Sequence, residues 1–458
     1  MTIKNAINRI ENLLPESIST KAAIKKQHGM NETYFPEMLP DAVVFPKDTK
    51  EVSEILKICH EEKCPVVAWG TGTSLEGNAL AEKGGVSLDM INMNKVLSIN
   101  PEDMDVIVQP GVTREQLNSE LKALGLFFPV DPGANASLGG MAATRASGTT
   151  AVRYGTMREN VLGLEIVLAN GTIIRTGGRS RKSAAGYDLT KLMVGSEGTL
   201  AIMTELTLKL QGRPESIAAA ICAFPTVDKA VQTVIQTIQM AIPVARMELL
   251  DTETILACNE YFKESMSLSP HLFLEFHGSE ASVREQSEIV SEIASSLSGS
   301  DFKWSSKSEE RNKLWKARHN AFYAVKAKYP GYKAIATDAC VPISKLADLI
   351  DETARDISRS GIPGPIWGHV GDGNFHATLL IRENSKEDRE IAQGIIHRMC
   401  QRCLQMEGTI TGEHGIGMGK LQYMRDEHGY GWEVMSEIKK ALDPNCILNP
   451  GKVIRSNQ

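Results

Sequence analysis

The chain has 458 residues, of which 42% are hydrophobic and 23% are charged, and its formal net charge is −6. This length predicts two or three domains with ample core, and the mildly acidic balance argues against nucleic acid or an anionic membrane as a partner. Because no apolar stretch approaches the ~20 residues of a spanning helix, we expect no transmembrane segment.

The N-terminal stretch MTIKNAINRIENLLPES (residues 1–17) predicts an amphipathic helix. It lacks the apolar core of a signal peptide, and Glu11 and Glu16 argue against an Arg-rich transit peptide. The eight cysteines are scattered, and the close pair Cys400 and Cys403 lies in a helical stretch, where two structural cysteines are the expected interpretation. Reduced thiols without an export signal predict a cytoplasmic protein.

Short apolar runs between glycine-rich turns predict strands from about residue 40 to residue 212. These runs are DAVVFP, PVVAW, GVSLDM, DVIVQPG and LGLEIVLANGTIIRTG, and the last contains a strong hairpin turn at Asn170-Gly171. A helix is predicted over 113–125, from a capping box at Thr113 to Gly125.

The pattern changes after Gly212, where longer helical stretches begin to alternate with strands. Helices are predicted over 227–241 and 281–297, and strands over 218–225 and 271–278. This alternation predicts an open sheet with covering helices.

The stretch AWGTGTSLEGNAL (residues 68–80) resembles a phosphate-binding loop. It fails the G-x-G-x-x-G pattern at Leu75, and it lacks the lysine and hydroxyl of a P-loop at Asn78-Ala79. What remains is a nest of backbone N–H groups that can bind an anion, with a plain surface turn as the alternative.

Four further glycine-rich stretches occur, at 130–148, 153–163, 182–202 and 448–452. Glycine and small residues recur where a backbone approaches a ligand closely. Five such loops imply one large ligand that lies across several of them, and a dinucleotide is the natural candidate because its pyrophosphate is bound by N–H donors.

A second set of residues has the chemistry of a metal site. In WGHVGDGNFHATLL (367–380), a two-residue type I′ turn at Asp372-Gly373 would place His369 opposite His376, with Cβ atoms ~5 Å apart. Two imidazoles at that distance can share a divalent cation, although a core or hydrogen-bonding role is the alternative for a lone pair. Glu413, in the glycine-rich stretch 409–420, would complete a His-His-carboxylate set with positions open for substrate.

Taken together, these stretches resemble the vanillyl-alcohol oxidase/p-cresol methylhydroxylase superfamily, and within it the D-2-hydroxy-acid dehydrogenase branch. The resemblance runs from about residue 40 to residue 455. It implies an α+β fold with a two-subdomain FAD-binding domain at 1–212. A substrate (cap) domain with an antiparallel sheet would follow at 213–420, and a C-terminal segment, 421–458, would return to the FAD domain.

The resemblance implies that FAD is the dinucleotide. Since residues 69–78 and 130–160 contain neither histidine nor cysteine, we expect the flavin to be bound noncovalently. The residues that the resemblance assigns to the cofactor are Trp69, Gly70, Thr71, Gly72, Thr73, Ser74, Leu75, Gly77, Pro132, Gly133, Gly140, Ala143, Ser147, Gly148, Gly155, Glu197, Gly198, Ile202 and Asn449.

In the branch that this chain resembles, the motif HxGDGNxH and the glutamate of a Glu-His pair, here Glu413-His414, hold zinc or manganese. The resemblance therefore implies His369, His376 and Glu413 as metal ligands and His414 as the base. It also implies that Arg318 binds the substrate carboxylate, with Lys333 as a weaker second candidate; a solvated surface position is the alternative for both.

The implied reaction is oxidation of a D-2-hydroxy acid, with D-lactate as the expected substrate. Glycolate and D-2-hydroxyglutarate are alternatives, and the metallohydrolase and the non-catalytic FAD-binding subunit are alternatives from other classes. The electron acceptor stays open between a quinone, a cytochrome, an electron-transfer flavoprotein and oxygen. The resemblance favours a homodimer.

Overall fold

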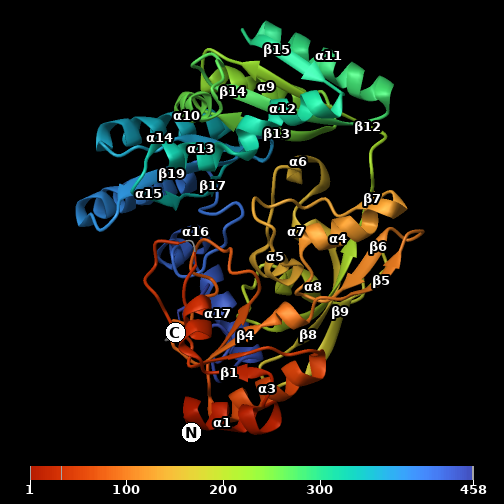
Figure 1. Cartoon of the computed structure of the whole chain (residues 1–458), viewed down its shortest axis with the longest axis vertical. Coiled ribbons are helices and arrows are strands. Elements are labelled where there is room, and N and C mark those ends of the chain that lie inside the picture. The colour runs from red at the N-terminus through yellow and green to blue at the C-terminus, as the bar shows by residue number, and fades with distance from the viewer. Residues whose placement is uncertain (1, 32, 456–458) are drawn as a thin grey trace. The chain divides into compact units, whose positions relative to one another are not determined.

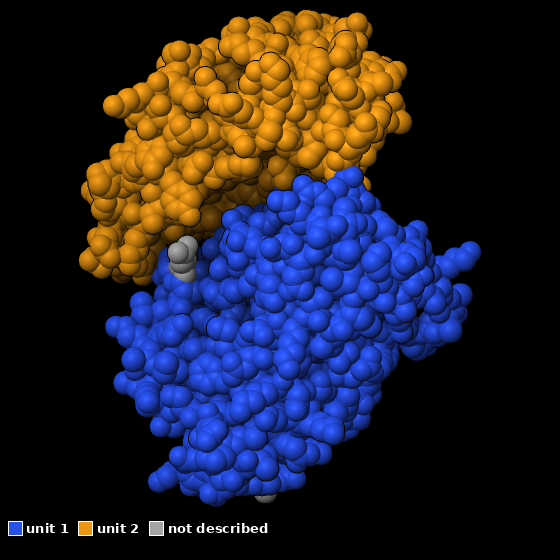
Figure 2. Space-filling view, turned by 45° about the vertical axis from the view of Figure 1, so that its right-hand side comes forward, with its two compact units in different colours: residues 1–148, 155–213, 413–458 blue, residues 149–154, 214–412 orange. Residues whose placement is uncertain are grey.

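The computed structural model describes residues 2–31 and 33–455. Its internal contacts divide the chain into two units, which Figure 2 distinguishes by colour. Unit 1 comprises residues 1–148, 155–213 and 413–458, and unit 2 comprises residues 149–154 and 214–412. Residues 413–420, which the sequence places at the end of the cap domain, therefore belong to unit 1.

Unit 1 contains two larger sheets, each with its own hydrophobic core, and a two-stranded antiparallel sheet formed by β7 and β11. The first has the order β1-β2-β4-β3, with β2 and β3 both parallel to β4. The second is antiparallel throughout and has the order β5-β6-β10-β8-β9. The strands are β1 (Ile18–Ser19), β2 (Ala42–Val44), β3 (Val66–Trp69), β4 (Val86–Asp89), β5 (Val96–Asn100), β6 (Asp105–Val108), β7 (Leu126–Phe127), β8 (Val161–Val167), β9 (Ile173–Gly177), β10 (Ile202–Lys209) and β11 (Gln211–Gly212).

The helices of unit 1 follow the expected capping and amphipathic patterns. The N-terminal helix α1 buries Ala6 and Ile10, as its apolar spacing predicts. Thr113 caps α4 through the Gln116 N–H, but the Gln116 side chain donates to the Asn94 carbonyl, so only half of the predicted capping box forms. The helical stretch ends at Gly125, whose φ of +69° suits glycine. The helices are α1 (Ile3–Leu13), α2 (Ala22–His28), α3 (Thr49–Glu62), α4 (Arg114–Leu121), α5 (Leu138–Thr144), α7 (Met157–Asn160), α8 (Leu189–Met193), α16 (Met424–His428) and α17 (Gly431–Leu442), with 3-10 turns η1 (Met90–Asn92), η2 (Lys122–Leu124) and η5 (Leu421–Tyr423).

Unit 2 is built on one antiparallel sheet of order β15-β12-β14-β13-β18-β19-β16, with β17 also paired to β19. Its strands are β12 (Ser216–Ala223), β13 (Val244–Leu250), β14 (His271–Gly278), β15 (Ser300–Ser305), β16 (Tyr332–Ala336), β17 (Ala339–Cys340), β18 (Ile366–His369) and β19 (Asn374–Arg382). The helices are α6 (Ala151–Tyr154), α9 (Val227–Gln239), α10 (Thr252–Phe262), α11 (Glu280–Ser296), α12 (Ser308–His319), α13 (Ala321–Lys328), α14 (Leu346–Ser360) and α15 (Lys386–Gln405), with 3-10 turns η3 (Ile343–Lys345) and η4 (Val370–Asp372).

Helices cover both faces of the unit 2 sheet, as the alternation of elements predicts (Figure 1). On one face, α10, α12 and α13 share a hydrophobic core with the strands, centred on Phe273 and Trp315. On the other, the row α11, α9, α14 and α15 packs helix against helix, with α11 on β12 and β14 and α15 on β19. Cys400 and Cys403 are buried in α15 as reduced thiols, and Cys403 Sγ bonds to the Cys340 and Thr409 carbonyls, consistent with two structural cysteines.

The face that α12 covers also carries charged residues in the middle of the sheet. Glu248 of β13 lies opposite His369 of β18, and Arg246 of β13 lies opposite Glu275 of β14. Because side chains alternate between faces with period two, all four project from the same face. This face positions the candidate site.

Asp251, the N-cap of α10, is expected to make stability depend on pH. Its carboxylate accepts hydrogen bonds from the Thr254 N–H (2.8 Å) and hydroxyl (2.6 Å), and burial raises its pKa to about 6, against an ordinary value of 3.8. Between pH 4 and pH 6 the folded state therefore keeps a proton that the unfolded state releases, so the unfolding free energy falls as the pH rises through this window.

The variant Asp251→Asn cannot ionise, so its unfolding free energy should not fall in this way between pH 4 and pH 6. It keeps a side-chain oxygen that can cap α10. Its melting temperature should match that of the parent near pH 4 and exceed it above pH 6, with a gain of up to about 3 kcal/mol at 1.36 kcal/mol per pKa unit. Thermal unfolding between pH 4 and pH 7 tests this, with Asp48→Asn at the exposed N-cap of α3 as the matched control. A difference between variant and parent that does not change with pH would refute the assignment.

Candidate functional site

The two histidines of the HVGDGNFH motif lie on neighbouring strands, but in a different register from the predicted one. His376 pairs with Trp367 rather than with His369. The predicted two-residue type I′ turn is therefore wrong: the connection is the 3-10 turn η4 followed by Gly373, with φ +75°. A side chain at Gly373 would meet the Val341 carbonyl oxygen at 2.1 Å, so glycine allows this turn to pack closely against Val341.

The register error of two residues leaves the predicted proximity intact. Side chains alternate with period two along a strand, so His369 stays on the same face as its second neighbour Trp367 and hence as His376. The ring centroids of His369 and His376 are 5.4 Å apart.

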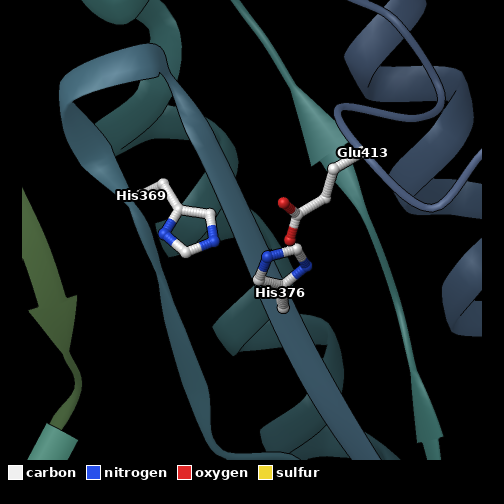
Figure 3. Close-up of side chains that lie close together, drawn as sticks. All are labelled: His369, His376 and Glu413. Atoms are coloured by element: carbon white, nitrogen blue, oxygen red, sulfur yellow. The ribbon is translucent and has the colours of Figure 1, made fainter. Parts of the chain in front are cut away.

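Glu413 completes the predicted ligand set. One ligand atom from each of His369, His376 and Glu413 can be chosen so that all three lie within 4.8 Å of one another. Figure 3 shows the two rings and the carboxylate turned toward a common space. Two ligand atoms that each lie about 2 Å from one ion are at most about 4 Å apart. Small rotations of the three side chains would therefore bring these atoms to metal-binding distances.

The hydrogen bonds of the two rings at Nδ1 are those expected of metal-binding histidines. His369 Nδ1 lies 2.7 Å from Glu248 Oε1, and His376 Nδ1 lies 3.0 Å from the Thr337 carbonyl oxygen. Because a carboxylate and a carbonyl accept, each Nδ1 carries a hydrogen, and Nε2 is the nitrogen that can ligate a metal when the ring is neutral. A ring that donates from one nitrogen to an oxygen and ligates through the other is the usual state of a metal-bound histidine. The residues therefore fit a divalent metal such as zinc or manganese.

Asp338, which the sequence leaves without a role, supports the loop that leads to Glu413. Its buried carboxylate accepts hydrogen bonds from Asn374 Nδ2 and from the Thr411 hydroxyl, each at 2.7 Å. A side chain at Gly412 would approach Asn374 Nδ2 to 2.3 Å, so the glycine before Glu413 allows this close packing.

Glu248 is a residue of the candidate site that the sequence analysis does not single out. Its side chain is fully buried and accepts hydrogen bonds from His369 and from Arg318, whose Nε and Nη2 lie 2.8 and 2.6 Å from Oε2. Burial by itself raises the pKa of Glu248, but the adjoining His369 and Arg318 outweigh it and hold the pKa below its ordinary value. The signal in the sequence is a glutamate in the apolar strand VARMELL, where a charge requires partners.

Arg318 is thus joined to a metal-ligand candidate through Glu248, whereas Lys333 is not. Lys333 pairs with Ile381 of β19, an odd number of positions from His376, so it projects from the opposite face of the sheet. Its Nζ forms a 3.2 Å ion pair with Glu383, and both side chains are 57% exposed. This position favours a solvated ion pair over a catalytic role.

The predicted cofactor residues all lie in unit 1. Trp69 ends β3 and is followed by the loop with Gly70, Thr71, Gly72, Thr73, Ser74, Leu75 and Gly77; Pro132 and Gly133 precede α5; Gly140 and Ala143 lie in α5, with Ser147 and Gly148 after it; Gly155 precedes α7; Glu197 and Gly198 follow α8; Ile202 begins β10; and Asn449 follows α17.

Hydrogen bonds bring several of these loops together. The Asn449 Nδ2 donates to the Asn78 carbonyl at 2.8 Å and to the Glu197 carbonyl at 2.7 Å. The Glu197 N–H donates to the Ala143 carbonyl at 2.8 Å. The loop after β3, helix α5, the turn before β10 and the C-terminal segment therefore converge within unit 1. At Gly72, which has φ +70°, a side chain would meet the Trp69 ring at 2.4 Å.

The Glu197 carboxylate forms its hydrogen bonds with other groups of the protein. Its carboxylate accepts from the N–H groups of Ile416 (2.7 Å) and Gly417 (2.9 Å) and from Asn78 Nδ2 (2.6 Å). Burial raises its pKa and outweighs these hydrogen bonds. The Met418 N–H donates to the Glu76 carbonyl at 2.8 Å, so the segment that begins with Glu413 and the half-buried His414 is anchored on two of the predicted cofactor loops. These bonds explain why residues 413–420 belong to unit 1.

Comparisons with known proteins agree with this architecture. Residues 40–177 match the FAD binding domain family, and residues 213–453 match the family of FAD linked oxidases, C-terminal domain. The chain belongs to the FAD-linked oxidase family and is an FAD-dependent oxidoreductase. This confirms the inferred FAD-binding class.

Its relatives include D-lactate dehydrogenases. The chain is 51% identical, over 97% of its length, to a probable mitochondrial D-lactate dehydrogenase of Danio rerio, of which it covers 90%. It is 47% identical, over 98% of its length, to a mitochondrial D-lactate dehydrogenase (cytochrome) of Arabidopsis thaliana, of which it covers 80%. Membership of the D-2-hydroxy-acid dehydrogenase branch is thereby confirmed.

The predicted fold class is confirmed by solved structures. The chain superposes on p-cresol methylhydroxylase with a TM-score of 0.82 at 18% identity, covering 99% of this chain and 97% of that one. It superposes on alkyldihydroxyacetonephosphate synthase with a TM-score of 0.74 at 19% identity, covering 98% and 85%.

The predicted cytoplasmic location is wrong. The relatives from Danio rerio, Arabidopsis thaliana, Kluyveromyces lactis and Saccharomyces cerevisiae are all named as mitochondrial. Reduced cysteines indicate a reducing environment, which does not distinguish one such compartment from another. Among the described residues, no helix is both long enough and apolar enough to cross a membrane.

Proposed function

We propose that this protein oxidises a D-2-hydroxy acid, with D-lactate as the first candidate, and that it uses noncovalent FAD and a divalent metal, zinc or manganese. The observation that carries the metal assignment is the His369–His376–Glu413 cluster, in which each histidine Nδ1 faces an oxygen acceptor, as it does in a histidine that ligates a metal through Nε2. The D-lactate assignment is supported by the names of relatives at 38–51% identity.

The residues of the site supply binding and proton transfer. FAD, when bound, would supply the hydride acceptor for C2, and a metal held by His369, His376 and Glu413 would supply Lewis-acid polarisation of the substrate hydroxyl. His414 takes the hydroxyl proton, a role that contributes ~10²–10⁴-fold in general-base catalysis. Arg318, whose Nε and Nη2 face Glu248, binds the substrate carboxylate through its remaining N–H groups.

The alternatives differ in their support. Glycolate has the support of the Bacillus subtilis glycolate oxidase subunit GlcD, to which the chain is 35% identical over 96% of its length, covering 94% of that protein. The same cluster of side chains would suit a metallohydrolase, but a hydrolase has no need of the FAD-binding domain matched at residues 40–177. Among electron acceptors, a cytochrome has the support of the names of the Arabidopsis and yeast relatives.

Anaerobic bleaching of the flavin tests this proposal. D-lactate should bleach the yellow absorbance of the bound flavin, L-lactate should not, and prior treatment with a chelator should slow bleaching by about 10³-fold, the equivalent of several kcal/mol of Lewis-acid stabilisation. D-2-hydroxyglutarate and glycolate in parallel rank the substrates, and ferricytochrome c added after bleaching tests the acceptor. A colourless purified protein, or bleaching that is indifferent to chelation, would contradict the proposal.

A further inference from the structure

Glu248 lies among the charged residues on one face of the unit 2 sheet, which are Arg246, Glu248, Glu275 and His369. It faces His369 across one strand pairing and Phe273 across the other, and its side chain is 0% exposed. One carboxylate oxygen, Oε1, accepts from His369 Nδ1 at 2.7 Å, and the other, Oε2, accepts from both Nε and Nη2 of Arg318. Both oxygens are therefore directed by partners that come from different elements, β18 and α12.

We propose that Glu248 is a positioning residue that sets two functional groups at once: the His369 ring toward the metal and the Arg318 guanidinium toward the substrate carboxylate. This inference rests on the proposed function. A buried carboxylate is tolerated only with well-placed partners: rotation of Arg318 would leave its charge uncompensated, and rotation of His369 would remove the hydrogen bond to Oε1. The same bond that keeps the hydrogen of His369 on Nδ1 leaves Nε2 as the ligand atom, and such partners typically change metal affinity by about 10–100-fold.

The neighbouring strand offers an internal comparison. Glu275 of β14 is also buried and also bridges a histidine and an arginine: Oε1 lies 2.8 Å from His277 Nε2, and Oε2 lies 3.3 Å from Arg246 Nη1. The other nitrogen of His277, however, lies 2.7 Å from the Tyr154 hydroxyl. The two ring nitrogens of His277 thus bond to Tyr154 and Glu275, whereas His369 is one of the three residues of the candidate ligand cluster.

This pair of glutamates provides a matched experiment on the full-length, FAD-loaded protein. Glu248→Gln and Glu275→Gln each neutralise a buried carboxylate between a histidine and an arginine on the same sheet face. Bound metal is removed with chelator, and Mn²⁺ is then titrated into the parent and into each variant. The Mn²⁺ dissociation constant should rise about 10–100-fold in Glu248→Gln and stay within about twofold of the parent in Glu275→Gln. At saturating Mn²⁺, KM for D-lactate should rise in Glu248→Gln and not in Glu275→Gln.

Flavin content and thermal unfolding show whether each variant is folded. If Glu248→Gln does not fold, Glu248→Asp keeps the charge with a shorter reach and should raise the Mn²⁺ dissociation constant by a smaller factor. Equal Mn²⁺ affinity in the parent and in a folded Glu248 variant would overturn the inference, as would equal weakening in the Glu248 and Glu275 variants. A parent protein that binds no Mn²⁺ would instead defeat the proposed function, so the two failures are distinguishable.

Discussion

His369→Ala and His376→Ala should each remove the bound metal and lower the rate of flavin reduction by D-lactate by about 10³-fold or more. Each substitution deletes one of three candidate ligands, and the Lewis-acid contribution of a catalytic metal amounts to several kcal/mol, at 1.36 kcal/mol per factor of ten. FAD should stay bound, because the assigned cofactor residues lie in unit 1 and both histidines lie in unit 2. Metal analysis of the purified proteins, flavin content and anaerobic stopped-flow absorbance measure the three quantities separately.

The matched control for these variants is His271→Ala. His271 is a buried histidine of the same sheet, on β14, and its Nδ1 bonds to the Ser269 carbonyl at 2.8 Å. This variant should lose stability without losing metal. If a variant of His369 or His376 is free of metal and still reduces its flavin at the parent rate, the metal has no part in the reaction and the assignment fails.

Replacing His414 should separate proton transfer from metal binding. His414 directly follows Glu413, and the segment after it is held by the bonds of Ile416 and Gly417 to Glu197, which the substitution leaves in place. His414→Gln should therefore keep both metal and FAD and lower the rate of flavin reduction by ~10²–10⁴-fold, the usual contribution of a general base. The pH dependence of the reduction rate should lose the limb that reports the base.

His428→Gln, in α16 of the same unit, is the control for this variant, because it changes an exposed histidine outside the site. It should leave the rate, the metal and the flavin unchanged. A His414→Gln variant that retains the parent rate would show that another group accepts the proton. Loss of metal from this variant would place His414 among the ligands instead.

The register of the histidine hairpin shows why one part of the site was predictable. The turn was assigned from a local dipeptide, and that assignment is wrong by two residues. The proximity of His369 and His376 survives because an even shift does not change the face of a strand. Lys333 shows the opposite case, since its pairing partner Ile381 is an odd number of positions from His376, and no local pattern reveals which strand lies beside β19.

The amino-acid sequence by itself determined the local elements, the set of candidate ligands and the glycine-rich loops, because capping, turn formation and side-chain alternation depend on residues a few positions apart. Only the tertiary structure decided which carboxylate holds which partner. Glu248 and His369 are 121 positions apart, and Glu197 and Ile416 are 219 apart. Pairings at such distances follow from strand order and loop convergence, which arise when the whole chain buries its apolar surface, and so they leave only indirect traces in the sequence, such as a single charge within an apolar strand.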